Sequence, residues 1–112
     1  MNFKSETKEE KSSELTCERV FNSYEELAGQ EIELTAINWG MSASEDGEEI
    51  LMSIDDEALQ GLQQAHVLVH FSKDQAEEIK RFEENDSISL TAKVGALEFG
   101  AVRLINPKIS SN

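Results

Sequence analysis

The two histidines of this 112-residue chain, His66 and His70, have the i, i+4 spacing at which helical side chains can share a metal ion. Residues 66–71 read HVLVHF, and this alternation predicts a strand instead of a helix. On a strand the two imidazoles lie roughly 13 Å apart, which is too far for one ion held through bonds of about 2.1 Å. We therefore expect two separate histidines that face a groove or solvent, and no metal site.

Carboxylates cluster at residues 45–49 (EDGEE) and 55–57 (DDE). Neither run has the D-x-[DN]-x-[DN]-G spacing of an EF-hand calcium loop, so both are interpreted as solvated acidic surface. Nothing in the sequence marks these carboxylates as buried or mutually shielded, as acid/base catalysis requires. The sequence also lacks a Ser-His-Asp order, a nucleophile elbow, a Cys-His pairing and a glycine-rich phosphate loop. We expect no catalytic residue, no cofactor and no enzyme activity.

Alternating apolar residues predict five β-strands, and these would have to position any site. They cover residues 30–41, 49–55, 66–71, 87–94 and 97–105. In the first strand the apolar phase shifts by one residue after Ala36, which predicts a bulge or a strong bend. Gly95-Ala96 is expected to make the tight turn between the last two strands, and Pro107 is expected to end the pairing.

Two capping-box patterns predict helices. Ser23 and Glu26 begin one over about residues 23–28, which Gly29 ends, and the sequence SKDQ begins another over about residues 73–83. Residues 55–65 are interpreted as a short amphipathic helix or turn that links two strands.

The length suits a single domain. Residues 1–14 are polar and predict a disordered tail, residues 15–109 form the expected domain, and residues 110–112 form a second tail. The sequence has no apolar run near the ~18 to 20 residues of a membrane span, and its first residues lack a signal-peptide core. The expectation is a cytoplasmic protein, or an exported or lipoprotein origin if a leader was removed. Cys17 is the single cysteine, so an intrachain disulfide is excluded.

The expected order is a short helix, three strands, a helix and two strands. This order predicts a mainly β fold, an OB-like five-stranded Greek-key β-barrel with a helix between strands three and four. Four segments resemble the bacterial tRNA_anti-like family of small OB-fold proteins, over roughly residues 20–109. They are residues 29–35 (GQEIELT), 67–71 (VLVHF), 87–94 (SISLTAKV) and 99–104 (FGAVRL).

The resemblance implies the OB-fold, and the family's name suggests nucleic acid as a ligand. Three positions depart from the family's pattern. Ala36 and Ala92 stand where similar proteins tend to have glycine, and Asn85 stands where they have a glycine turn.

Charge argues against the ligand that the family name suggests. Residues 1–19 hold four basic and five acidic side chains, so residues 20–112 carry −12 of the formal net charge of −13. Nucleic-acid binding draws much of its affinity from Lys and Arg that neutralise phosphates. A domain this acidic favours a different partner.

OB-folds bind ligands on the face of strands two and three and with the loops that flank it. The residues expected to bind there or nearby are Trp39, Leu51, His66, Leu68, His70, Lys93 and Arg103. Trp39 is the candidate for stacking on a ligand, with a core position at the barrel rim as the alternative interpretation. The sequence thus predicts a non-enzymatic acidic module that engages or inhibits a protein, for which a basic partner fits the charge and a nucleic-acid mimic is a sharper variant. The alternative is a weak single-stranded DNA- or RNA-binding protein.

Overall fold

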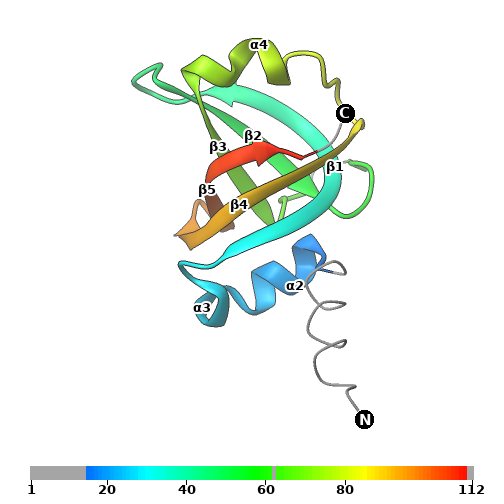
Figure 1. Ribbon diagram of the computed structural model, residues 1–112. Coiled ribbons are helices and arrows are strands. Elements are labelled where there is room, and N and C mark those ends of the chain that lie inside the picture. Colours follow the sequence, from blue (N-terminus) through cyan, green and yellow to red (C-terminus); the bar gives the residue numbers. More distant parts are fainter. Residues whose placement is uncertain (1–14, 62, 111–112) are drawn as a thin grey trace.

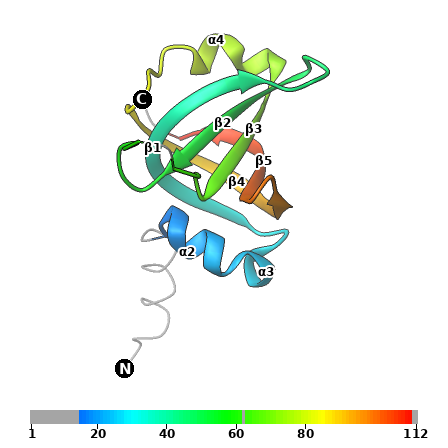
Figure 2. The same ribbon diagram turned by 180° about the vertical axis from the view of Figure 1, so that it is seen from behind.

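Five strands close into one barrel in a computed structural model that describes residues 15–61 and 63–110. The strands are β1 (Glu31–Ala43), β2 (Glu49–Asp55), β3 (Val67–Ser72), β4 (Ser87–Glu98) and β5 (Ala101–Ile109) (Figures 1 and 2). Their order around the barrel is β1-β2-β3-β5-β4, and every neighbouring pair is antiparallel except β3 and β5. The mainly β Greek-key barrel expected from the sequence is confirmed. The predicted tail over residues 1–14 lies outside the described residues.

The predicted break in the first strand is confirmed as a bulge. The register of β1 against β2 shifts between Asn38 and Gly40, so Trp39 is left without a partner in the ladder. The Asn38 side chain stabilises the bulge, because its Nδ2 donates to the Glu83 carbonyl and its Oδ1 accepts from the Gly40 amide. The bend lets one long strand pair with β4 through its first half and with β2 through its second.

The predicted turn at Gly95-Ala96 is wrong, because β4 continues through both residues to Glu98. A Cβ on Gly95 would lie 3.2 Å from the Arg103 carbonyl oxygen, so this glycine allows close packing of β4 and β5 and does not reverse the chain. The chain reverses instead at Phe99 and Gly100, which have φ values of 53° and 80°.

Pro107 does not end the pairing as predicted. Strand β5 continues past it, and Lys108 and Ile109 still pair with β4. The ladder is irregular at this point and Asn106 has a φ of 52°, which is the kind of bulge that accommodates a residue without an amide hydrogen.

The helices are shorter than predicted, and a further one precedes the first predicted helix. From residue 15 to the first strand there are two, α2 (Cys17–Asn22) and α3 (Tyr24–Leu27). Thr16 caps α2, whereas Ser23 makes no side-chain capping bond. Gly29 follows with a φ of 81°, as a helix stop requires.

The predicted helix after β3 forms a 3-10 turn, η1 (Lys73–Gln75), and one turn of α-helix, α4 (Ala76–Ile79). The capping box between Ser72 and Gln75 is confirmed. Residues 55–65 were predicted to form a short amphipathic helix or turn, and residues 55–61 and 63–65 contain no helix but bends at residues 56, 57 and 61.

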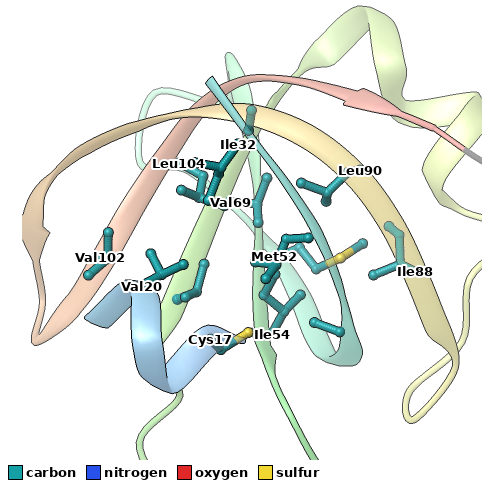
Figure 3. Packing of buried hydrophobic residues seen from close by; sticks show 14 of the residues in the cluster. Cys17, Val20, Ile32, Met52, Ile54, Val69, Ile88, Leu90, Val102 and Leu104 are labelled. Atoms are coloured by element: carbon teal, nitrogen blue, oxygen red, sulfur yellow. The ribbon is translucent and has the colours of Figure 1, made fainter. Parts of the chain in front are cut away.

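Both ends of the barrel are covered. Helix α2 lies at one end and α4 at the opposite end (Figures 1 and 2). Inward side chains from all five strands form the core together with Cys17 and Val20 of α2 (Figure 3). Ile79 of α4 belongs to the same cluster. The strand residues at its centre, such as Met52, Ile54 and Val69, are fully buried. The faces opposite these residues point outward and are free to form a site. Within the described residues, no helix has the length and apolar character needed to cross a membrane.

Candidate functional site: a cleft between two loops

A cleft of about 640 Å³ crosses the outer face of β2, β3 and β5. Its floor is formed by Leu51, His70 and Arg103, one residue from each of these strands. The loop between β1 and β2 (residues 44–48) forms one wall, and the turn between β4 and β5 (Glu98 to Gly100) forms the other. We call this groove the interloop cleft.

Hydrogen bonds order the acidic wall of the cleft. The Ser44 hydroxyl donates to Asp46 Oδ1 and accepts from the Glu49 amide, at 2.7 and 3.1 Å. Asp46 Oδ1 also accepts from the Glu48 amide at 3.0 Å. These bonds, led by the one from Glu48, hold the pKa of Asp46 below its ordinary value. Asp46 therefore keeps its negative charge in the cleft wall at neutral pH.

An exposed aromatic residue forms the opposite wall. The Phe99 side chain is 77% exposed, and its backbone lies in the left-handed region that non-glycine residues rarely adopt. Its carbonyl accepts a hydrogen bond from Gln64 Nε2 at 3.1 Å, which ties the turn to the segment before β3. Backbone strain that is kept to present a large apolar side chain to solvent is typical of binding positions.

His70 connects the two walls beneath the cleft. Its Nδ1 lies 2.9 Å from Glu49 Oε1 and its Nε2 lies 2.6 Å from Glu98 Oε1. The imidazole is only 5% exposed, whereas the two carboxylates are 42% and 28% exposed. Arg103 adds a weaker contact, with its Nε 3.8 Å from the same oxygen of Glu98. The cleft thus has a charged floor, with two half-open carboxylates above a buried ring.

The structure brings four of the predicted binding residues together. His70 lies opposite Leu51 in the register of β3 and β2, and Leu68 lies opposite Arg103 in the register of β3 and β5. Because side chains alternate along a strand, the outward residues of these neighbours share one surface. Leu51, Leu68, His70 and Arg103 therefore occupy the same face of the barrel.

The other three predicted residues lie elsewhere. Trp39 and His66 line a separate cavity of about 260 Å³ beside the segment that follows β2. Trp39 Nε1 donates to the Glu57 carbonyl at 2.7 Å, and His66 Nδ1 lies 2.8 Å from Asp55 Oδ2. Lys93 is opposite Glu31 in the register of β4 and β1, and it lines neither cavity. Trp39 is thus half-buried at the bulge and does not face the cleft.

The exposed aromatic residue of the site was missed by reasoning from the sequence. Phe99 and Glu98 were placed inside the last strand, because the turn was expected four residues earlier. The available signal was Gly100, which could have been interpreted as a turn residue as readily as a bulge. Glu49 was treated as general acidic surface.

Within the described residues, one group could offer three atoms to a metal ion. Cys17, Asp55 and Asp56 hold their ligand atoms within 4.8 Å of one another. Hydrogen bonds already account for the two carboxylates. Asp56 accepts from the amides of Cys17 and Glu18 and thereby caps α2, and Asp55 accepts from the amides of Asp56 and His66. Burial, together with the charges of Asp56 and Asp55, raises the pKa of the Cys17 thiol. The arrangement is thus explained as a helix cap.

Comparison with solved structures identifies the fold of the chain. No protein-family model matches the chain, and no curated protein matches its sequence. A solved structure of a "putative nucleic acid-binding lipoprotein" from Klebsiella pneumoniae has a TM-score of 0.62 at 12% identity, over 80% of this chain and 77% of that one. The barrel is an OB-fold. Two OBody proteins bound to hen egg-white lysozyme have TM-scores of 0.56 and 0.55 at 15% and 17% identity, each over 90% of this chain and 92% of the other.

Proposed function

We propose that this OB-fold is a non-enzymatic binding module whose interloop cleft engages a basic segment of a protein partner. The observation that carries the proposal is the charge of the cleft. Four carboxylates line it, those of Glu45, Asp46, Glu49 and Glu98, against the single guanidinium of Arg103. A cleft with this excess of negative charge attracts cationic side chains and repels phosphates.

Apolar residues in the same cleft would slow the dissociation of the complex. Phe99 stands exposed at one wall and Leu51 lies on the floor, so a partner can bury both on binding. Exposed aromatic residues next to a charged rim are typical of protein interfaces. The likeness to OBody proteins, which are bound to lysozyme, supports a protein as the ligand class. The nucleic-acid-mimic variant rests on the same charges, because they would imitate phosphates toward a basic nucleic-acid-binding protein.

The test is the affinity for a rhodamine-labelled peptide of alternating arginine and leucine, followed by fluorescence anisotropy. Phe99→Ala should weaken binding about fivefold or more, because a buried aromatic side chain contributes over about 1 kcal/mol. The matched control is Leu97→Ala, since Leu97 is 43% exposed in the same hairpin but does not line the cleft. Equal affinities for both variants, or no peptide binding by the unaltered domain, would contradict the proposal.

Charge needs its own control. Glu45→Gln should weaken peptide binding and reduce its salt dependence, because it removes a charge from the cleft. Glu33→Gln removes an equal charge from the exposed side of β1, so it should change the affinity little. If both changes weaken binding equally, the attraction is to the overall charge of the domain and not to the cleft.

Single-stranded nucleic acid is the second candidate, and the comparison of solved structures supports it more directly than the first. The supporting observations are the likeness to the Klebsiella lipoprotein and the position of Phe99 and Arg103 on the same cleft. A base could stack on Phe99 while Arg103 contacts a phosphate. Labelled thymidine and uridine oligonucleotides at low salt test this candidate by anisotropy. Trp39 is a poor reporter for it, because it lies at the other cavity.

A further inference from the structure

We infer that the interloop cleft receives one cationic side chain of its ligand, an ammonium or a guanidinium, between Glu49 and Glu98, and that the protonation of His70 controls this binding. The inference rests on the proposed function, because it names the ligand group and the regulation of the same cleft. It follows from the way in which His70 is held.

The carboxylates of Glu49 and Glu98 both contact the imidazole ring of His70. Glu49 at the start of β2 and Glu98 at the end of β4 reach His70 from opposite walls, at 2.9 Å from Nδ1 and 2.6 Å from Nε2. The ring is nine-tenths buried, and the carboxylates remain partly open to the cleft. A ligand therefore meets the carboxylates first, with the imidazole below them.

The chemistry of imidazole makes this arrangement dependent on one proton. A neutral imidazole donates from one ring nitrogen, and only the imidazolium can donate to both carboxylates. Protonated His70 is thus an internal cation that satisfies Glu49 and Glu98. Loss of the proton leaves one carboxylate oxygen against a nitrogen lone pair, so that carboxylate gains from a cation supplied by a ligand.

The other charges around His70 do not cancel this effect. Arg103 from β5 approaches Glu98 Oε1 at 3.8 Å, and its buried Nε has no hydrogen-bond partner among the described residues. Glu45 and Asp46 from the β1–β2 loop line the same cleft and add negative charge. The set of Glu49, Glu98, Arg103 and His70 is neutral with an imidazolium and carries one negative charge without it. Loss of the His70 proton therefore strengthens the binding of a cation, so the affinity for a cationic ligand is expected to rise with pH.

The experiment measures the affinity for the rhodamine-labelled arginine-leucine peptide from about pH 5 to pH 8 at constant ionic strength. Arginine keeps its charge throughout, so the slope reports the protein. The unaltered domain should bind about three- to tenfold more tightly at the alkaline end, the effect of one nearby, partly screened charge. His70→Gln should remove the slope. His66→Gln is the matched control, since His66 lies at the other cavity, and it should retain the slope.

The outcomes separate the inference from the proposed function. Peptide binding that does not depend on pH, or a slope that persists in His70→Gln, overturns the inference and leaves the proposed function standing. Absence of peptide binding at every pH overturns the proposed function itself. Oligonucleotide binding that strengthens as pH falls, without peptide binding, assigns the cleft to nucleic acid and overturns both.

A measurement on the unaltered domain does not depend on the folding of a variant. The His70 ring protons can be followed by NMR as pH is changed, with and without saturating peptide. Binding and protonation are linked reciprocally, so the peptide must move the loss of the His70 proton to lower pH. An unchanged titration of His70 in the presence of bound peptide overturns the inference.

Discussion

Replacement of Asp56 by alanine should loosen the end of the barrel that α2 covers. Asp56 accepts from the Cys17 amide at 2.6 Å and from the Glu18 amide at 3.2 Å, and Thr16 Oγ1 accepts from the Arg19 amide at 3.1 Å. Three of the four amides at this helix terminus that lack an intrahelical acceptor are thus satisfied, two of them by Asp56 alone. The helix buries Cys17 and Val20 completely, so its attachment contributes to the core.

The expected loss in the free energy of unfolding is about 1 to 2 kcal/mol. Removal of an N-cap side chain costs about 0.5 to 2 kcal/mol. We expect the upper half of this range, because the Asp56 carboxylate accepts from two amides that would lose their hydrogen-bond acceptor in Asp56→Ala. Urea unfolding followed by Trp39 fluorescence measures this loss. The matched control is Glu57→Ala, which removes one negative charge from the next residue, an exposed one.

Thiol reactivity gives a second readout of the same change. The Asp56 carboxylate is among the causes that raise the pKa of the Cys17 thiol, so Asp56→Ala should let a disulfide reagent react faster with Cys17. Unfolding free energies of Asp56→Ala and Glu57→Ala that agree within about 0.5 kcal/mol, with equal thiol reactivities, would refute the reasoning.

Three further predictions test other parts of the structure. The native Cys17 thiol should resist alkylation at neutral pH, because burial raises its pKa in the folded state. The free energy of unfolding should therefore fall as pH rises above about 8.5, the ordinary pKa of a thiol, and urea unfolding at a series of pH values measures this fall. The pKa of Asp46 is lowered, so its hydrogen bonds persist at and above its ordinary pKa and are lost only as pH falls through the lowered pKa. The carboxyl NMR signal of Asp46 should therefore titrate at unusually low pH. Phe99→Gly should raise the unfolding free energy by about 0.5 to 1 kcal/mol, because Phe99 has a φ of 53° and is largely exposed. It should weaken peptide binding at least as much as Phe99→Ala, and a loss of stability would contradict this reasoning.

The barrel could be predicted because its signals are local and periodic. Alternation assigned the inward residues of each strand, including Ile54, Val69 and Leu90, all of which are fully buried. The apolar phase shift after Ala36 indicated the bulge at Asn38 and Gly40. Period-two side-chain direction also placed Leu51, Leu68 and His70 on the outer face of the second and third strands, and the register of β2 and β3 is consistent with this. The same rule placed His66 there too, but His66 lines the other cavity.

The cleft walls could not be predicted, because they depend on contacts between distant segments. Gly95 looked like a turn residue, but its role is to admit the Arg103 carbonyl at close range, and this is visible only once β4 and β5 are paired. Phe99, which was expected inside the last strand, therefore lies at the tip of the turn between β4 and β5. The position of Trp39 also depends on a contact with a distant segment, because the bulge directs its side chain to the Glu57 carbonyl and away from the expected face. The pairing of His70 with Glu49 and Glu98 joins three strands and has no signature in the sequence.

The binding cleft is tested most directly by chemical-shift mapping of the isotopically labelled domain with the arginine-leucine peptide. The account predicts that the largest amide shifts occur at Leu51, His70, Phe99 and Arg103, with Trp39 and His66 little changed. Shifts that centre on the Trp39 and His66 cavity, or that spread evenly over the acidic surface, would contradict it.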